Sequence, residues 1–307
     1  MQIRTDLAME AGLNVSVRGI RQKRSCIGKI ETTEVVVETE EAAKRLQKPR
    51  GHYITFSMDD LYYADAGERL KLSHQLAICL RKLLPAEGDL LVVGLGNRRI
   101  TADALGSKVL DHLLITRHLQ EKDGSMLYDG LRGVCALAPG VLGVTGMETA
   151  EVIRGIVQHV KPTAVIAIDA LAARESSRIC TTIQLTDTGI LPGSGVGNHR
   201  TGLNEKTLGV PVIAIGVPMV VYATVIARDA LELMIRDMEI SEERLDSVMD
   251  ELISKTLDHP LGDMVVTPRE VDAMVGKVAR IIGDGINEAV QKALSAEELS
   301  ALAHDSL

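Results

Sequence analysis

The chain has 307 residues, of which 46% are hydrophobic and 25% charged, with a formal net charge of −8. This composition is typical of one large or two smaller globular domains with ample core. Aromatic residues make up only 2% of the sequence, so the core must be aliphatic. Single-stranded nucleic-acid binding needs stacking residues and an excess of positive charge, so we expect no direct contact with nucleic acid.

The sequence also indicates the cellular compartment of the protein. No apolar run approaches the ~20 residues that span a bilayer, and residues 1–10 contain charges but no apolar core of a signal peptide. Cys26, Cys79, Cys135 and Cys180 are widely spaced without a C-x-x-C motif, which indicates reduced thiols. We therefore expect a cytoplasmic protein without membrane contact.

Residues 4–11 contain a pattern typical of a cleavage site. A polar arm ends in Asp6 and is followed by Leu7, by the small Ala8 and by Glu10. A terminal segment of this kind need not lie in a core. The same residues are also compatible with a helix start in which Thr5 or Asp6 is the N-cap, so the pattern alone leaves both interpretations open.

The N-terminal part of the chain is predicted to be rich in β-structure. Residues 29–38 and 52–57 are β-branched or aromatic runs bounded by charge or turn residues. Apolar residues at helical spacing then predict a helix over residues 67–84.

From residue 90 onwards, apolar strands alternate with helices. The strands are predicted at 90–95, 133–138, 164–168 and 210–216, and the helices at 102–119, 148–161 and 220–234. Such alternation predicts an α/β fold with a mainly parallel sheet sandwiched by helices. We expect a single domain over residues 7–307, with residues 7–66 as its β-rich extension.

Two features are predicted in the C-terminal part. Residues 236–258 are charged and predict a solvated helical excursion. Thr267, Pro268 and Glu270 form an N-cap, a first-turn proline and a capping-box glutamate, which predict the start of a last helix. Gly283 and Gly285 are expected to weaken or break that helix.

Two aspartates follow predicted strands of the parallel sheet. Asp103 comes after the strand at 90–95, and Asp169 comes at the end of the strand at 164–168. Catalytic groups of open α/β sheets gather beyond the carboxyl ends of the strands. If the two carboxyls face each other, one stays protonated while the other is ionised, and the pair can activate a water and protonate a leaving amine. Alternatively, each aspartate caps a following helix.

Other motifs give weaker indications. Asp187-Thr188-Gly189 matches the D-T-G of all-β aspartic proteases, but in an α/β chain a turn after a strand at 181–185 is favoured. The glycine-rich loop 193–198 lacks the phosphate-binding pattern but is suited to an anion or substrate cradle. The sequence has no H-E-x-x-H and no G-x-S-x-G, which argues against a zinc peptidase and a serine hydrolase.

Several long blocks together resemble the spore germination proteases of endospore-forming bacteria. The blocks are LVVGLGN (91–97), TADALG (101–106), LLITRHL (113–119), PGVLGVTGMET (139–149), IAIDALAAR (166–174), GSGVGN (193–198) and MVVTPREVD (264–272).

The resemblance implies an endopeptidase that starts the degradation of small acid-soluble DNA-protecting spore proteins during germination, in the spore core. It implies a zymogen that cleaves itself between Asp6 and Leu7, so that residues 1–6 are a propeptide. It assigns Asp103 and Asp169 as the catalytic pair of an atypical aspartic peptidase and implies a homotetramer without a metal or other cofactor. The relatives carry a longer insertion near residues 236–258.

The resemblance also implies a fold similar to that of hydrogenase-maturation endopeptidases, in which the equivalent carboxylates bind a metal. We assign substrate-orienting roles to Thr101, Gly193, Ser194 and Gly195. Two alternatives remain: a metal-dependent maturation endopeptidase, which a chelator would inhibit, and a non-enzymatic anion-binding α/β module, which would be indifferent to loss of either aspartate. If Asp187 were catalytic instead, its replacement by Asn would inactivate the protein.

Overall fold

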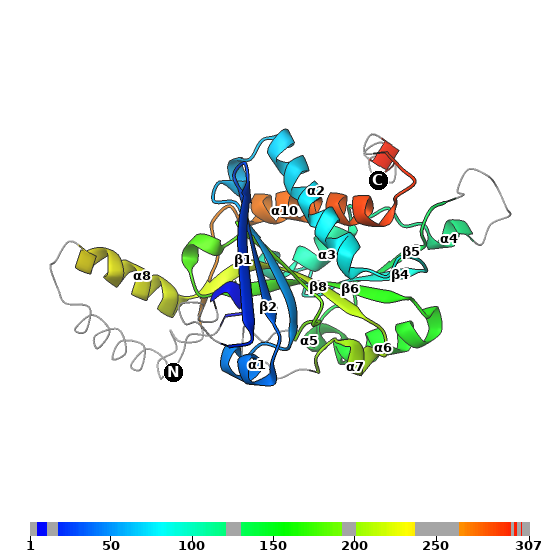
Figure 1. Cartoon of the computed structure of the whole chain (residues 1–307), viewed down its shortest axis with the longest axis horizontal. Helices are drawn as coiled ribbons and strands as arrows, with labels where there is room; N and C mark the ends of the chain where they lie inside the picture. The colour runs from blue at the N-terminus through cyan, green and yellow to red at the C-terminus, as the bar shows by residue number, and fades with distance from the viewer. Residues whose placement is uncertain are drawn as a thin grey trace.

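The computed structural model describes residues 5–10, 18–120, 130–191, 201–236 and 264–295, together with positions 298, 299 and 302. The strands of this described part form one sheet in the order β1-β2-β3-β7-β8-β6-β4-β5, with β9 paired to β8 (Figure 1). The strands are β1 (Ile20–Ile27), β2 (Ile30–Val37), β3 (Gly51–Ser57), β4 (Leu90–Gly94), β5 (Val134–Leu137), β6 (Ala164–Ala173), β7 (Thr182–Thr186), β8 (Val212–Tyr222) and β9 (Val265–Val266).

The sheet has a parallel and an antiparallel half. Strands β5, β4, β6 and β8 are parallel neighbours, whereas β8–β7, β7–β3, β3–β2 and β2–β1 pair in antiparallel fashion. The predicted α/β fold is thus confirmed, with its parallel part confined to four strands. The β-rich N-terminal extension joins the same sheet through β3 and β7.

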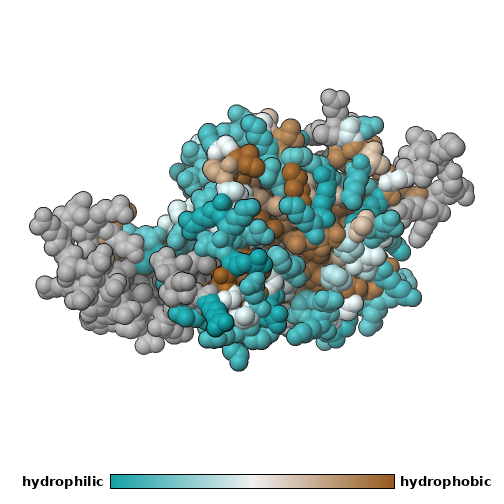
Figure 2. Space-filling model, in the orientation of Figure 1, coloured by the Kyte–Doolittle hydropathy of each residue, from teal (hydrophilic) through white to brown (hydrophobic). Residues whose placement is uncertain are grey.

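Helices cover both faces of the sheet. One face packs against α2, α3 and α10 through a large aliphatic core, and the other packs against α6 and α7, with α1 over its antiparallel half. In the same orientation, Figure 2 shows apolar residues concentrated between these helices and hydrophilic ones at the periphery. The α-helices are α1 (Glu40–Leu46), α2 (Ala66–Leu83), α3 (Leu105–Leu110), α4 (Arg117–Gln120), α5 (Leu142–Thr145), α6 (Thr149–Val160), α7 (Glu205–Leu208), α8 (Ala223–Arg236) and α10 (Val271–Val290).

Short 3-10 helices complete the described elements: η1 (Ala8–Glu10), η2 (Leu61–Tyr63), η3 (Thr101–Asp103) and η5 (Ser176–Arg178). None of the helices within the described residues is long and apolar enough to cross a membrane. All four cysteines are free thiols. Beyond the end of α8 at residue 236, the charged excursion expected at 236–258 lies outside the described residues.

Strand β6 is longer than its sequence suggests. It continues to Ala173, so Asp169 lies inside the strand rather than at its end. The alanine-rich stretch after Asp169 favours a helix by propensity, but it pairs with β8 from Asp169 opposite Gly216 to Ala173 opposite Val221. The backbone hydrogen bonds of the sheet therefore override the local preference, and Asp169 caps no helix.

The helix expected at 102–119 is broken. Helix α3 covers only Leu105–Leu110. A turn at 111–112 and irregular residues 113–116 separate it from the short helix α4. The backbone N–H of Leu114 donates to the Asn287 side chain at 2.9 Å, and that of Thr116 donates to Val134 O at 3.1 Å. Hydrogen bonds to α10 and β5 thus replace those of a continued helix.

Helix α10 begins and ends later than predicted. It starts at Val271, because the hydroxyl of Thr267 donates to Met219 O in β8 (2.9 Å) instead of capping the helix. Gly283 and Gly285 do not break it. A Cβ at Gly285 would lie 2.9 Å from Leu76 Cδ2 and 3.0 Å from Ser73 O, so this glycine lets α10 pack closely on α2.

We expect Gly285→Ala to lower the free energy of unfolding by about 1–3 kcal/mol, because the added methyl group overpacks the contact with α2. The matched control is Gly276→Ala in the same helix, where a Cβ meets nothing within 4 Å. That change should be neutral or raise the free energy of unfolding by up to ~1 kcal/mol through helix propensity. Urea denaturation followed by circular dichroism checks both, and equal effects of the two substitutions would contradict the packing role.

Candidate active site

A row of polar positions crosses one face of the sheet. The strand registers place five residues side by side from β2 to β6: Thr33, Thr55, Gln184, Gly216 and Asp169. Side chains of directly opposed residues lie on the same face of a sheet. This polar row therefore lies on the face opposite α2 and α10, and Asp169 forms its end.

The two predicted aspartates come from neighbouring parallel strands. The loop after β4 leads through Gly96 to η3, which contacts both β6 and β8. The N–H of Leu95, at the end of β4, donates to Ile168 O (2.8 Å), immediately before Asp169. Asp103 lies against Gly96, where a Cβ would come within 2.8 Å of its Oδ1. The fold thus brings both aspartates to the same end of the parallel strands.

Neither aspartate serves as a helix cap. Asp103 Oδ2 accepts a hydrogen bond from the backbone N–H of Asn97 (2.8 Å), and helix α3 has no side-chain cap. Asp169 is buried, 6% exposed, and its Oδ1 accepts from the N–H of Ala170 (2.9 Å). Both carboxylates are held in place by backbone amides, which fixes their orientation.

The N-terminal segment Thr5–Glu10 docks on the same face. The N–H of Asp6 donates to Ala172 O (3.1 Å), and Ala172 N–H donates to Asp6 Oδ2 (3.0 Å). Leu7 and Ala8 are fully buried in two separate apolar clusters. Asp6 therefore anchors the segment to β6 rather than capping a helix, although residues 8–10 do form the short helix η1.

Leu7 lies close to the polar row. Its side chain packs with Leu171, which is two residues beyond Asp169 on the same face of β6. Leu171 fills the space over Gly216, where an added Cβ would lie only 2.4 Å from Leu171 Cδ1. The glycine in the row is thus what allows Leu171 to support the docked Leu7.

Two side chains hold the carbonyl group of Asp6. Lys48 Nζ donates to Asp6 O at 3.0 Å and to Thr5 O at 3.0 Å. Gln184, from the polar row, donates its Nε2 hydrogen to Asp6 O at 3.2 Å and accepts from Ala8 N–H at 2.7 Å. The carbonyl of the bond between Asp6 and Leu7 is thus polarised by a cation and an amide.

Helix α1 positions Lys48. The helix ends at Gln47, which adopts the left-handed conformation (φ 52°), and Lys48 N–H then donates to Ala43 O at 3.1 Å. Burial lowers the pKa of Lys48, an effect that the nearby Asp6 and Glu10 partly offset. Its ammonium group is therefore a desolvated charge, which interacts more strongly with a carbonyl than an exposed lysine does.

A cavity of about 160 Å³ lies beside the docked segment. Its lining includes Asp6, Lys48, Tyr53, Gln184 and Gly216. Burial raises the pKa of Tyr53 to about 12, so its hydroxyl stays protonated at neutral pH. The docked segment and this cavity therefore share Asp6, Lys48 and Gln184, and together we call the surface that they occupy the groove.

The remaining predicted site residues lie elsewhere. The Thr101 hydroxyl donates to Asp272 Oδ1 in α10 (2.8 Å), and Gly193, Ser194 and Gly195 lie outside the described residues. Asp187 follows β7 and accepts from His52 N–H at 2.8 Å, as expected for a residue that closes a strand end. It is therefore not brought next to Asp169.

A metal site of the zinc type uses three or more protein ligands. The described part of the chain contains no group of three His, Cys, Asp or Glu side chains that could hold an ion in this way. The two aspartates alone do not complete such a set.

Three residues that contact the docked segment had no signal in the sequence. Lys48, Gln184 and Arg178 belong to no motif, and they come from the segment after α1, from β7 and from η5. Glu10 was part of the cleavage-like pattern, and its carboxylate is bound by Arg178 and by backbone N–H groups. The partners of a motif can be found only when the fold brings them to it.

Comparison with known proteins gives consistent matches. The family model for germination protease matches residues 4–257. A germination protease of Clostridium acetobutylicum is 43% identical over 97% of this chain and 98% of its own length. That of Clostridium perfringens (strain SM101) is 41% identical over the same shares. The Bacillus velezensis germination protease is 36% identical over 98% of this chain and 97% of its own length.

Among solved structures, the NiFe hydrogenase maturation protease HycI from Thermococcus kodakarensis is a distant match. It is 20% identical with a TM-score of 0.30, covering 46% of this chain and 80% of that protein.

The Glu10 carboxyl makes the stability of the docked state depend on pH. Burial raises the pKa of Glu10 above its ordinary 4.5, and the charge of Glu175 adds to this. The Thr5 hydroxyl, the Arg174 N–H and the charge of Arg178 oppose it, and Lys48 also faces the carboxyl. A carboxyl whose pKa is higher in the folded state binds protons there first, so its contribution to stability decreases as pH rises from 4.5 through the raised pKa.

We expect the free energy of unfolding of the wild type minus that of Glu10→Gln to decrease as the pH rises above 4.5. Urea titrations at several pH values, on protein shown by mass spectrometry to be intact, measure this difference. A difference that grows with pH would mean that the ionised carboxylate is the better-bound form.

Proposed function

The chain belongs to the germination protease family, a family of peptidases that act in spore germination, and we propose that it is an endopeptidase that initiates the degradation of small acid-soluble spore proteins. We propose further that it is made as a zymogen that cleaves its own bond between Asp6 and Leu7. The observation that carries this is the docked segment: the bond that the sequence marks for cleavage lies beside the polar row that contains Asp169.

The proposed reaction is hydrolysis by the Asp103–Asp169 pair. The ionised carboxylate takes a proton from a water molecule, whose oxygen adds to the carbonyl carbon of Asp6. The bond from that carbon to Leu7 N then breaks, and the protonated carboxyl gives its proton to the departing nitrogen. The products are a carboxylate on Asp6 and an amine on Leu7. The supporting geometry is the placement of Asp169 within β6, just beyond its pairing with β4, and of Asp103 in η3, which follows β4 and contacts β6.

In the proposed mechanism, Lys48 and Gln184 stabilise the charge that develops on the Asp6 carbonyl oxygen. Negative charge develops on the carbonyl oxygen as water adds, and donors aimed at that oxygen stabilise the transition state. Both side chains already donate to Asp6 O, at 3.0 and 3.2 Å. We therefore assign them the role of an oxyanion-binding pair.

The docked segment also explains how so short a propeptide could keep the enzyme inactive. Residues 5–8 fill the groove in which a protein substrate would have to bind. Cleavage removes the contacts of Asp6 with Ala172, Lys48 and Gln184, which loosens the hold of the segment on the groove.

We propose that the enzyme needs no metal or other cofactor, works in the spore core and assembles as a homotetramer. The first point predicts activity that survives exhaustive treatment with a chelator, whereas the metal-dependent alternative predicts its loss. Light scattering of the purified protein reports the assembly state.

The catalytic role of the aspartates predicts loss of proteolysis in Asp103→Asn and Asp169→Asn. Loss of general acid or base catalysis typically costs about 10²–10⁴-fold in rate, and we expect at least the lower figure for each. The assay is cleavage of a purified small acid-soluble spore protein, with each enzyme trimmed to begin at Leu7 so that failed self-processing does not hide the result.

The control is Asp187→Asn, which removes a carboxylate that closes a strand end and should leave cleavage largely intact. If both pair variants cut at the wild-type rate while folded, the two carboxylates are structural. If Asp187→Asn alone is inactive, the D-T-G motif carries the chemistry.

The oxyanion-binding role predicts slow self-processing in Lys48→Met and Gln184→Leu. Removal of one such donor costs about 10²–10³-fold in the rate of the chemical step. Mass spectrometry of the full-length chain over time, following the loss of residues 1–6, measures this rate. Lys44→Met is the control, because Lys44 is exposed on α1; processing of all three at one rate would refute the assignment.

A further inference from the structure

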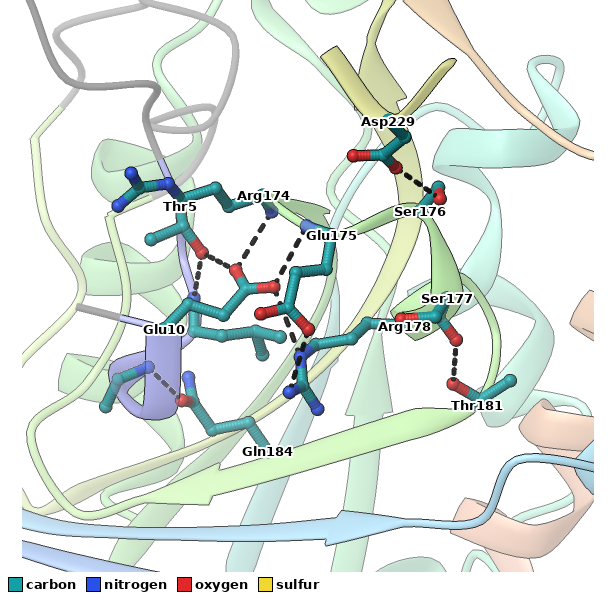
Figure 3. A network of polar contacts seen from close by, with 12 residues as sticks. Thr5, Glu10, Arg174, Glu175, Ser176, Ser177, Arg178, Thr181, Gln184 and Asp229 are labelled. Carbon is teal, nitrogen blue, oxygen red and sulfur yellow. Dashed lines mark hydrogen bonds and ion pairs between the residues drawn. The ribbon is translucent and has the colours of Figure 1, made fainter. Parts of the chain in front are cut away.

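Glu10 places its carboxylate in a polar pocket. The side chain is 1% exposed. Its Oε2 accepts from the N–H of Arg174 at 2.9 Å and from the hydroxyl of Thr5, and its Oε1 accepts from the N–H of Glu175 at 3.1 Å (Figure 3). Arg178 Nε lies 3.3 Å from the same Oε1, as a close ion pair rather than an aligned hydrogen bond.

The pocket is built by the body of the protein. The two amides belong to the turn that leads from β6 into η5, and Arg178 is the last residue of η5. The Arg178 guanidinium is braced by Glu175 Oε2 at 2.9 Å. Only the Thr5 hydroxyl comes from the docked segment itself, so the pocket does not depend on that segment for its shape.

The segment is recognised residue by residue. Asp6 pairs with the backbone of Ala172, Leu7 and Ala8 occupy separate apolar clusters, and Glu10 occupies the polar pocket. Met9 is only partly buried. A terminal arm held simply by hydrophobic burial would not need a dedicated polar pocket for one of its residues.

We infer that this pocket, formed by Arg178 and the amides of Arg174 and Glu175, is a specificity subsite of the protease. It binds a glutamate at the fourth position after the cleaved bond of a protein substrate, and Glu10 occupies it in cis before a substrate does. The inference rests on the proposed endopeptidase function.

The chemistry selects a carboxyl group over an amide. Both oxygens of Glu10 face N–H donors. A glutamine in the same place would turn its NH2 group toward one of these N–H donors. The NH2 group and the N–H donor would then both lack an acceptor in a buried site. A buried donor left without a partner costs about 1–3 kcal/mol, which corresponds to a preference for glutamate of about 10- to 100-fold.

The test compares two peptides that contain Thr-Asp-Leu-Ala-Met-Glu or Thr-Asp-Leu-Ala-Met-Gln with identical flanks. The enzymes are the self-processed wild type, Arg178→Gln and Arg178→Lys, and the quantity is the ratio of kcat/KM for the two peptides. We expect the wild type to favour the glutamate peptide by about 10- to 100-fold. In Arg178→Gln the ratio should fall about tenfold, which is ~1.4 kcal/mol, and Arg178→Lys should recover part of it.

Arg154→Gln is the matched control, since it removes an exposed arginine of α6 and should leave the ratio unchanged. A wild type without preference, or an Arg178→Gln variant with the wild-type ratio, overturns the subsite. If the wild type cleaves neither peptide nor its own bond between Asp6 and Leu7, the proposed function fails and the subsite with it.

A second variant decides the matter if Arg178→Gln does not fold. Glu10→Gln weakens the binding of residue 10 to the pocket and leaves the pocket itself intact. The substrate glutamate then meets less competition, so we expect the KM for the glutamate peptide to fall severalfold. If Glu10 is only a structural anchor, Glu10→Gln gives an unchanged or higher KM.

Discussion

The arrangement depends on β6 extending beyond its parallel neighbour β4. The β4–β6 pairing ends with Gly94 opposite Ile168, yet β6 continues to Ala173. Backbone N–H and C=O groups that are buried must find partners. At Ala172 both groups bond to Asp6. The protruding end of β6 thus serves as a template on which an extended peptide can dock, immediately after the residue that carries a catalytic carboxylate in our proposal.

The same extension links recognition with chemistry. Asp169 ends the polar row, Leu171 packs against Leu7, Ala172 holds Asp6, and the amides that bind Glu10 follow directly at residues 174 and 175. A peptide bound along this strand is therefore fixed in register by successive side chains. Because the spacing along a strand is regular, our proposal implies that the residues on both sides of the cleaved bond set its position.

The N-terminal segment is bound by the protein at two places, the Glu10 carboxylate and the Asp6 carbonyl. Its glutamate is buried at the cost of desolvation, which only a pocket with several donors offsets. Its Asp6 carbonyl is held by a desolvated lysine and by Gln184. The contacts that keep the segment in the groove are thus the contacts that would prepare a substrate for hydrolysis.

The sequence by itself determined the periodic elements and the family. Apolar runs located β4 and β5 to within a residue and the start of β8, which continues six residues beyond its predicted end. Helical spacing located α2 and α6, because burial on one or both faces imposes a regular pattern. The family blocks marked Asp103, Asp169 and the segment around Asp6 as candidates. These are local signals, readable from neighbouring residues.

The tertiary structure decided which contacts form between segments that are far apart in the sequence. Pairing with β8 turned the alanine-rich stretch after Asp169 into strand. Close contact with α2 required Gly285 of α10, which propensity alone would count against the helix. Lys48, Gln184 and Arg178 acquired a role only because the segment after α1, strand β7 and η5 meet the same six-residue segment. Such roles arise from hydrogen bonds and burial between elements far apart in the chain, and no local pattern encodes them.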